Sequence, residues 1–392
     1  MPDGDARLGG ETRRDLRLKL RQRNPATPHY RSPVSRSARR LGGWLLAGSL
    51  LVGLSGCEEK PPLHESMVVF GSEADFDVVT DQPDQARQAL GHIAERLAEY
   101  DHEWHPWIPG PLVDINRAIA NGERAEAPAS VIMLIDRSRP FQSMTDGLYD
   151  PAIGGLLEMW GFHTSEFPVT TPAPDDDQVR RWRESLPTLD SVHIEGRWIS
   201  SDNPNVQLDF GAIAEGIAAE EAARTFSDYG INNALITLGG DVYALGKRGK
   251  RPWRVALRDP FGDVLGGVEL SGREALFTSG NYNKFREAPD GTRWAHVLDP
   301  RTGMPSSGVA AVAVLHPDPV LADVAATALL IGGPARFIEL SQRMKLGCTL
   351  LLTEQNELMI TRAMQARVTL QRQPVMLGEP VDLGDSCAQK TP

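Results

Sequence analysis

The stretch WAHVLDPRTGMP, residues 294–305, combines a predicted strand with a polar turn. Its first five residues, 294–298, predict a half-buried strand. The Asp-Pro pair that follows ends this strand, because proline donates no ladder hydrogen bond and restricts the residue before it. The turn then presents Arg301 and Thr302, so His296 lies near the strand end beside groups that suit an anion or a polar ligand. The alternative is an ordinary turn with a solvated Arg301 and a buried, hydrogen-bonded His296.

The N-terminal 57 residues have the composition of an export signal rather than of a folded domain. Residues 1–40 carry eleven Lys or Arg and four Asp or Glu. Residues 41–56 form an apolar run that is shorter than the roughly 20 residues of a membrane span. The run ends in LSGC, which resembles a bacterial lipobox; a plain cleaved signal is the alternative. We therefore expect a lipoprotein signal peptide, with a lipid on Cys57 that anchors the protein in the bacterial envelope, facing the periplasm. Glu58 after the cysteine favours the outer membrane.

The remaining chain is acidic. Without residues 1–57 the formal net charge changes from −11 to −18. Such a surface repels nucleic acid and anionic lipid headgroups, so we expect no nucleic-acid partner. A ligand with phosphate groups would need a local cation, such as a metal ion. Cys348 and Cys387 could pair in an oxidising envelope, but two cysteines alone do not establish a disulfide.

The rest of the sequence predicts one α+β domain, because helices and strands are mixed without strict alternation. We expect a polar tether at residues 58–66, the folded domain at 67–378 and a loose tail at 379–392. The predicted helices are residues 83–100, 114–121, 129–141, a short helix ending at 184, 212–229, 321–331 and 337–344. The predicted strands are one or two strands in residues 67–80, a hairpin at 191–200, and strands at 206–208, 234–238, 253–258, 264–270, 275–278, 309–315 and 349–353, with a strand or hairpin at 357–369.

The segment DFGAIAEG, residues 209–216, joins a predicted strand to a predicted helix. Free backbone amides at the start of a helix can hold an anionic group, and the glycine lets a ligand come close. Asp209 could instead serve only as the helix N-cap, which is a common use of aspartate at this position.

Asp323 and Thr327 are four residues apart in the predicted helix 321–331, so their oxygen atoms share one face. A carboxylate and a hydroxyl form a hard-oxygen pair that suits Mg²⁺. Alternatively, Asp323 could interact with the helix dipole while Thr327 bonds back to the backbone.

Three further motifs are candidates for ligand contacts. GLYDP, residues 147–151, could line a ring-binding pocket or simply pack. In TSGNY, residues 278–282, hydroxyl side chains and glycine follow a strand and could contact phosphate or ribose. In HEWHPW, residues 102–107, Trp104 could stack on a planar ligand or cap the core.

The motifs LYDP…GF, LDFGAIAEG, LGGD, TSGNY, HVLDPRTGMP and ADVAAT occur in this order behind the lipobox. Together they resemble the FAD:protein FMN transferase family, also called ApbE, over roughly residues 66–365. The resemblance implies a Mg²⁺-dependent periplasmic enzyme that cleaves FAD and joins FMN through a phosphoester to a Thr or Ser of a target flavoprotein, releasing AMP. It also implies a single α+β body of two lobes with the site in the cleft between them.

The resemblance assigns roles to residues of this chain. His296 matches the residue that helps to deprotonate the acceptor hydroxyl, and a neutral-range pKa would suit that role. The implied metal ligands are the Ala212 carbonyl, Asp323 and Thr327. Arg301 and Thr302 could hold phosphate oxygens, as could Thr278 and Ser279. The implied FAD contacts are Phe70, Trp104, Leu148, Tyr149, Asp150, Asp209 and Leu298.

The chain departs from the family pattern at Glu215, where a lysine is usual. An anion therefore replaces a cation that is expected near FAD. Two alternative functions stay open: an FAD pyrophosphatase that yields FMN and AMP, and a flavin-binding lipoprotein without turnover. Asp323, Thr327 and His296 argue against a mere binder, which needs no base.

Overall fold

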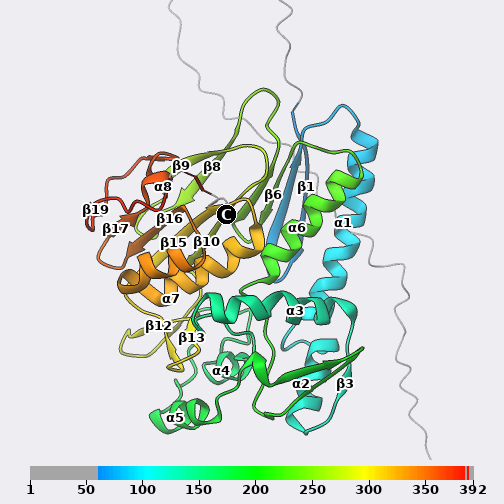
Figure 1. The fold of residues 1–392 in the computed structure, drawn as a ribbon, viewed down its shortest axis with the longest axis vertical. Coiled ribbons are helices and arrows are strands. Elements are labelled where there is room, and N and C mark those ends of the chain that lie inside the picture. Colours follow the sequence, from blue (N-terminus) through cyan, green and yellow to red (C-terminus); the bar gives the residue numbers. More distant parts are fainter. Residues whose placement is uncertain (1–60, 385, 388–392) are drawn as a thin grey trace, which may run out of the picture. The chain divides into compact units, whose positions relative to one another are not determined.

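The computed structural model describes residues 61–384 and 386–387, and their mixed helices and strands confirm the predicted α+β fold (Figure 1). The largest element is a nine-stranded sheet, in which every neighbouring pair is antiparallel except β17 and β19. In spatial order it comprises β1 (Leu63–Val69), β2 (Ser72–Val78), β6 (Ala234–Leu238), β7 (Asp241–Leu245), β10 (Glu274–Gly280), β15 (Val309–His316), β16 (Cys348–Thr353), β17 (Glu357–Ile360) and β19 (Val375–Met376).

Three long helices cover one face of this sheet: α1 (Pro83–Trp104), α6 (Ala214–Asp228) and α7 (Pro319–Arg343) (Figure 1). Apolar residues at steps of three and four form the buried side of α1, as predicted. The predicted helices 321–331 and 337–344 are the two halves of α7, separated by Gly333 with a φ of 65°. Although α7 is long and apolar enough to cross a membrane, it packs on β10 and β15 and contributes to the main core.

A smaller sheet covers part of the other face. It consists of β18 (Val368–Leu370), β9 (Val264–Leu270) and β8 (Trp253–Arg258), and a second apolar core lies between it and the large sheet. The predicted strands 253–258 and 264–270 are β8 and β9 of this smaller sheet, whereas β7 occupies the place beside β10 in the large sheet. The segment 357–369, predicted as a strand or hairpin, forms β17 and β18, which belong to different sheets and are joined through the short helix α8 (Arg362–Gln365).

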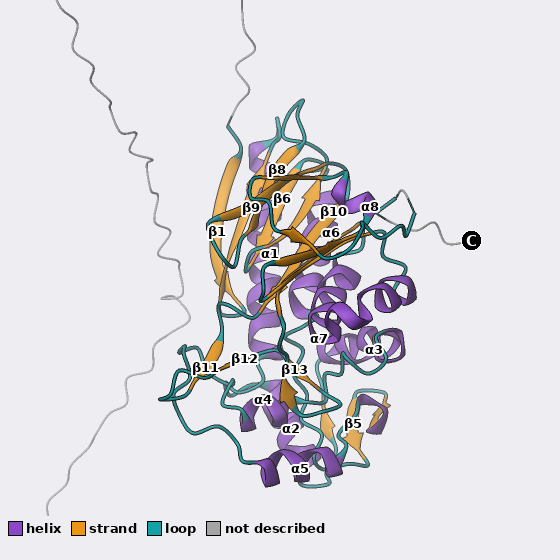
Figure 2. Ribbon diagram, turned by 90° about the vertical axis from the view of Figure 1, so that its left-hand side faces the viewer, coloured by secondary structure: helices purple, strands orange, loops and turns teal. Residues whose placement is uncertain are grey.

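Residues 111–201 supply most of a second lobe (Figure 2). Its helices are α2 (Pro111–Ala120), α3 (Ala129–Met144), α4 (Gly154–Met159), α5 (Asp176–Ser185) and the 3₁₀ turn η1 (Leu189–Ser191), and its sheet is β3 (Ala125–Glu126), β5 (Trp198–Ser201) and β4 (Val192–Glu195). The predicted strand at 206–208 is only an isolated bridge between Gln207 and Ile153. This bridge runs beside the segment that carries the LYDP motif.

The stretch 294–305 forms two short ribbons rather than one strand. β12 (Arg293–Ala295) pairs with β11 (Phe285–Glu287), and β13 (Leu298–Asp299) pairs with β14 (Met304–Pro305). The predicted strand is interrupted at His296 and Val297, which belong to neither ribbon. The interruption places His296 in a bend between two hydrogen-bonded anchors.

Both predicted ends of the domain need correction. β1 begins at Leu63 and pairs with β2, so the strand starts inside the predicted tether 58–66. At the other end, Val381 bridges to Thr361, Asp382 pairs with Arg362, and Cys387 forms a disulfide with Cys348. The described part of residues 379–392 is therefore bound to the fold rather than loose. The predicted signal peptide and Cys57 lie outside the described residues.

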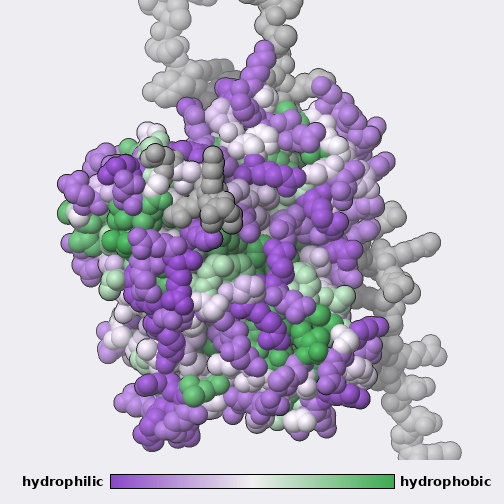
Figure 3. Space-filling model, in the orientation of Figure 1, coloured by the Kyte–Doolittle hydropathy of each residue, from purple (hydrophilic) through white to green (hydrophobic). Residues whose placement is uncertain are grey.

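The face shown in Figure 3 is largely polar, with an apolar area on the left over β17 and β19. Val375, Met376 and Leu377 are exposed there.

Candidate active site

A cavity of about 420 Å³ lies between the two lobes, within the size range of small-molecule sites. Its walls come from the segment after α3, the start of α6, the β6–β7 turn, β10, α7 and the stretch around His296. It brings together twelve of the sixteen residues predicted for the FAD and metal sites: Leu148, Tyr149, Asp150, Asp209, Ala212, Glu215, Thr278, Ser279, His296, Leu298, Asp323 and Thr327.

The imidazole of His296 is oriented by the backbone of Lys284. The Nδ1 atom of His296 lies 3.1 Å from the carbonyl oxygen of Lys284, which also accepts the backbone N–H of His296 at 3.3 Å. A carbonyl only accepts hydrogen bonds, so Nδ1 carries the proton and Nε2 keeps its lone pair. Burial and the nearby Lys284 lower the pKa of His296 to about 4. The expected neutral-range pKa was therefore wrong, and the ring is neutral and able to accept a proton at pH 7.

Three carboxylates line the same cavity: those of Glu215, Asp241 and Asp323. The carboxyl groups of Glu215 and Asp241 influence each other's pKa, and the charge of Glu215 also raises the pKa of Asp323. Burial raises the pKa of Glu215 to about 7, and burial together with the other carboxylates raises the pKa values of Asp241 and Asp323 well above the usual range. Gly239, with a φ of 59°, makes room for Glu215, because a Cβ there would lie 2.6 Å from its Oε1.

The contacts of Asp323 and Thr327 differ from the alternative in which Asp323 interacts with the dipole of its own helix and Thr327 bonds back to the backbone. The carboxylate of Asp323 accepts the backbone N–H of Gly216 at 2.8 Å, so it binds the start of α6 rather than that of its own helix, which Asp318 caps. Gly216 permits this close approach, because a Cβ would lie 2.8 Å from the carbonyl oxygen of Pro319. The Thr327 hydroxyl meets the Ser279 hydroxyl at 3.0 Å. Both side chains of α7 therefore face the cavity.

This oxygen set fits Mg²⁺. Buried carboxylates that repel one another need a cation, and hydroxyl groups and a backbone carbonyl at Ala212 line the cavity beside them. In the part of the chain that the structure describes, no group of three or more His, Cys, Asp and Glu side chains could hold a metal by itself. Mg²⁺ commonly binds to one or two carboxylates and completes its shell with water and phosphate, which this arrangement allows.

The turn that carries Leu148, Tyr149 and Asp150 is held rigidly. Tyr149 is buried and its hydroxyl lies 2.8 Å from the Ser138 hydroxyl. Asp150 accepts hydrogen bonds from Gln142 Nε2 at 2.7 Å and from the backbone N–H groups of residues 152 and 189. Burial raises the pKa of Asp150 to about 6. These contacts preorganise one wall of the cavity.

Asp209 does not cap α6, whose N-cap is Ile213. One carboxylate oxygen of Asp209 accepts the Gly211 N–H at 2.9 Å, and the other lies 3.2 Å from Nε2 of His163. The His163 ring in turn stacks on Trp107, with 5.0 Å between ring centroids. Neither ring was among the predicted site residues, although Trp107 lies in the HEWHPW motif.

The indole on the cavity wall is Trp107 rather than Trp104. Trp104 is buried, stacked between Tyr100 at 4.0 Å and Phe70 at 5.8 Å. Phe70 lies in the β1–β2 turn, where its backbone N–H donates to the Asp101 carboxylate. Phe70 is not on the cavity wall, but the nearby Ser72 is. The HEWHPW segment therefore does contribute an indole to the cavity wall, but that indole is Trp107 and not the predicted Trp104.

Arg301 and Thr302 also lie off the cavity lining. Arg301 makes a two-point ion pair with Asp299, at 2.9 and 3.0 Å, and the Thr302 N–H bonds to the Asp299 carbonyl. Of this turn, Pro300 reaches the cavity. The Arg301 guanidinium, predicted as a phosphate contact, is instead engaged by Asp299 and stabilises the turn.

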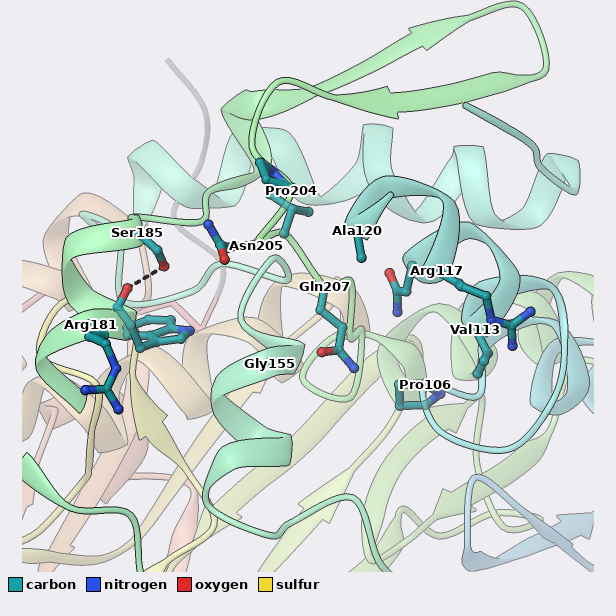
Figure 4. A pocket seen from close by; sticks show the side chains of 13 residues that line it. Pro106, Val113, Arg117, Ala120, Gly155, Arg181, Ser185, Pro204, Asn205 and Gln207 are labelled. Carbon is teal, nitrogen blue, oxygen red and sulfur yellow. Dashed lines mark hydrogen bonds between the residues drawn. The ribbon is translucent and has the colours of Figure 1, made fainter. Parts of the chain in front are cut away.

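A second cavity, of about 500 Å³, lies between α2, α4 and α5 and holds none of the predicted site residues. Figure 4 shows Arg181 of α5 and Arg117 of α2 on opposite sides, with Gln207 between them. Arg117 is paired with Asp114.

Comparisons with known proteins identify the family of this chain. A family model described as the ApbE family matches residues 70–351. An FAD:protein FMN transferase of Rhodobacter capsulatus is 36% identical over 338 residues, covering 85% of this chain and 64% of that protein. One of Vibrio cholerae is 27% identical over 308 residues, covering 76% of this chain and 90% of that protein. The match to the first relative thus spans less than two thirds of its length.

Solved structures show the same fold. The ApbE protein of Thermotoga maritima superimposes with a TM-score of 0.70 at 26% identity, covering 80% of this chain and all of that one. The flavin transferase ApbE of Vibrio cholerae gives a TM-score of 0.67 at 24% identity, covering 78% of this chain and 98% of that one.

Proposed function

The chain belongs to the ApbE family, and we propose that it transfers FMN from FAD to a Thr or Ser hydroxyl of a target flavoprotein, with release of AMP. One observation carries this proposal. A neutral imidazole with a free Nε2, at His296, lines the same cavity as the oxygen-rich cluster of Asp323, Thr327 and Ser279. A base and a cation site facing one cavity suit phosphoryl transfer better than storage of a flavin.

In this reaction the acceptor oxygen forms a bond to the FMN phosphorus while the bond to the AMP oxygen breaks. The hydroxyl proton moves to Nε2 of His296, and AMP leaves with the bridging oxygen. General-base assistance of this kind contributes about 10²–10⁴-fold to a rate. The carbonyl of Lys284 keeps the tautomer of His296 in the form that accepts the proton.

Asp323 and Thr327, with the Ala212 carbonyl, would hold Mg²⁺ beside the start of α6. When bound there, Mg²⁺ neutralises the negative charge that develops on the departing phosphate. The hydrogen bond from Gly216 fixes the Asp323 carboxylate in place before any ligand arrives. That preorganisation avoids reorganisation of the site during the reaction.

The flavin would lie against the aromatic and apolar part of the cavity. Trp107 is 40% exposed although it lines the cavity, and His163, fixed by Asp209, supports its ring. An exposed indole face held in this way suits stacking on a flat ring system. On the other side, the buried turn of Leu148 and Tyr149 supplies a rigid wall.

We also propose that the protein is a lipoprotein anchored through Cys57 in the envelope membrane, facing the periplasm. The LSGC motif after an apolar run supports this. The disulfide between Cys348 and Cys387 is consistent with an oxidising compartment.

The test uses residues 58–392 with FAD, Mg²⁺ and a flavoprotein domain that carries an acceptor Thr. AMP release and flavin fluorescence on the acceptor are followed together. The proposal requires equal amounts of both, and loss of both in EDTA. AMP without labelled acceptor would support the pyrophosphatase, and bound FAD without AMP would support the flavin-binding lipoprotein.

A further inference from the structure

Two cationic side chains of Arg or Lys line the active-site cavity, Arg258 and Lys284. Within residues 61–384 and 386–387, the Lys284 ammonium group has no carboxylate within 4 Å. Its situation differs from that of Arg301, whose guanidinium is held by Asp299. Lys284 is therefore a cavity cation whose charge is not neutralised by a direct contact.

The backbone of Lys284 is fixed relative to the catalytic centre. Its carbonyl oxygen accepts both the N–H and the Nδ1–H of His296, and β11 begins at the next residue, Phe285. The side chain is exposed, so the ammonium group can move while its Cα stays beside His296. A tether of this kind confines the positive charge to the part of the cavity next to the base.

The positive charge of Lys284 acts on two side chains of the cavity, Glu215 and His296. Lys284 lines the same cavity as Glu215 and His296, and its positive charge lowers the pKa values of both side chains. Within the described residues Glu215 and Lys284 nevertheless form no ion pair, because no carboxylate lies within 4 Å of the ammonium group. The positive charge of the ammonium group thus partly offsets the negative charge of these carboxylates without a direct ion pair to any of them.

An anionic ligand that enters this cavity meets Glu215, Asp241 and Asp323. Without a cation nearby, its negative charge would be repelled at short range. We propose that the Lys284 ammonium group binds the diphosphate of FAD and positions it in front of His296. This inference rests on the proposed function, since it takes FAD as the substrate. Lysine suits the task, because a compact ammonium on a flexible stem follows a phosphate group as a point charge.

The test compares FAD with riboflavin, which has the same ring system and no phosphate. In Lys284→Gln we expect FAD binding, measured by flavin fluorescence in EDTA, to weaken about tenfold, while riboflavin binding stays within twofold of the parent. Lys284→Arg should restore most of the FAD affinity. The salt dependence of FAD binding should also become shallower in Lys284→Gln, because one charge contact is lost.

The matched control is Lys247→Gln, which removes the same charge from an exposed residue outside the cavity lining. It should bind FAD as the parent does. An equal loss in both variants would show only an effect of net charge and would overturn the inference. So would parent-like FAD binding in Lys284→Gln, or an equal loss for FAD and riboflavin.

These measurements separate the two proposals, because they need no acceptor protein. If the parent binds FAD but transfers nothing, the proposed function fails while the role of Lys284 stands. If the parent transfers FMN and Lys284→Gln binds FAD normally, the role of Lys284 alone fails. A parent that binds no FAD overturns both.

Discussion

The Nδ1 atom of His296 and the carbonyl oxygen of Lys284 are 3.1 Å apart, and this contact sets the direction of the imidazole that we propose as the base. It is possible because the chain leaves β12 just before His296 and enters β13 two residues later. The bend frees the ring from the sheet, and the carbonyl fixes its tautomer. Nε2 of His296 is therefore the nitrogen that can accept a proton.

Replacement of His296 by Ala should slow FMN transfer about 10²–10⁴-fold, because the acceptor hydroxyl loses its proton acceptor. FAD affinity should stay within about twofold, since the flavin walls are unchanged. Single-turnover transfer and flavin fluorescence titration measure the two quantities. His193→Ala on β4, where His193 pairs with Asp202, is the matched control and should behave as the parent. Transfer at the parent rate in His296→Ala would mean that the base is elsewhere.

The transfer rate should show no acid limb near pH 6.5 from His296. Burial and Lys284 lower its folded pKa to about 4, so Nε2 is free above about pH 5. The unfolded chain takes up this proton below about pH 6.5, so the free energy of unfolding from this group falls as the pH drops from 6.5 to 4. Single-turnover rates and urea unfolding between pH 4.5 and 8 measure both effects. A limb at pH 6.5 that His296→Ala abolishes would contradict the low pKa.

Mg²⁺ should raise the melting temperature of the FAD-bound protein, and Asp323→Asn should remove this rise. Binding to the folded state alone stabilises by about 2.7 kcal/mol at 100 times the dissociation constant. Thr327→Val should weaken the rise because the hydroxyl ligand is lost, whereas Thr327→Ser keeps the oxygen and serves as the control. Thermal scans in Mg²⁺ and in EDTA measure it. An unchanged Mg²⁺ effect in Asp323→Asn would place the metal elsewhere.

Loss of the Cys348–Cys387 disulfide should destabilise the fold without changing the site. The bond closes a loop of 39 residues, for which the chain-entropy account gives roughly 3–4 kcal/mol. The urea midpoint of Cys348→Ser/Cys387→Ser should fall accordingly, while FAD affinity at 20 °C, measured well below the midpoint, stays that of the parent. A midpoint equal to that of the parent would show that the C-terminal segment is held by its other contacts, such as Asp382 with Arg362.

Residue spacing in the sequence predicted the features that depend on the geometry of a single helix. The apolar spacing of α1 and the four-residue spacing of Asp323 and Thr327 depend on helix geometry alone, and both appear in the structure. β7 escaped prediction because all five of its residues are buried, which leaves no alternation to detect. The strand predicted through His296 failed because two short ribbons, not one ladder, hold that stretch.

The site was predictable as a set of residue types but not as a set of contacts. Lys284 and Glu215 are far apart in the sequence, so the proximity of this cation to the anion at position 215 depends on the path of the β10–β11 loop. Trp107 replaces Trp104 on the cavity wall because α1 continues to Trp104 and buries it. Arg301 was assigned to phosphate because its pairing with Asp299 has no sequence signal.

The central claim is that FMN becomes covalently attached to an acceptor hydroxyl. The most direct measurement is the intact mass of the acceptor domain after incubation with residues 58–392, FAD and Mg²⁺, beside an acceptor whose Thr is replaced by Ala. The account predicts a gain of one FMN group on the Thr acceptor and none on the Ala acceptor. An unchanged mass on both, with AMP accumulating at the same time, would contradict transfer and identify hydrolysis as the reaction.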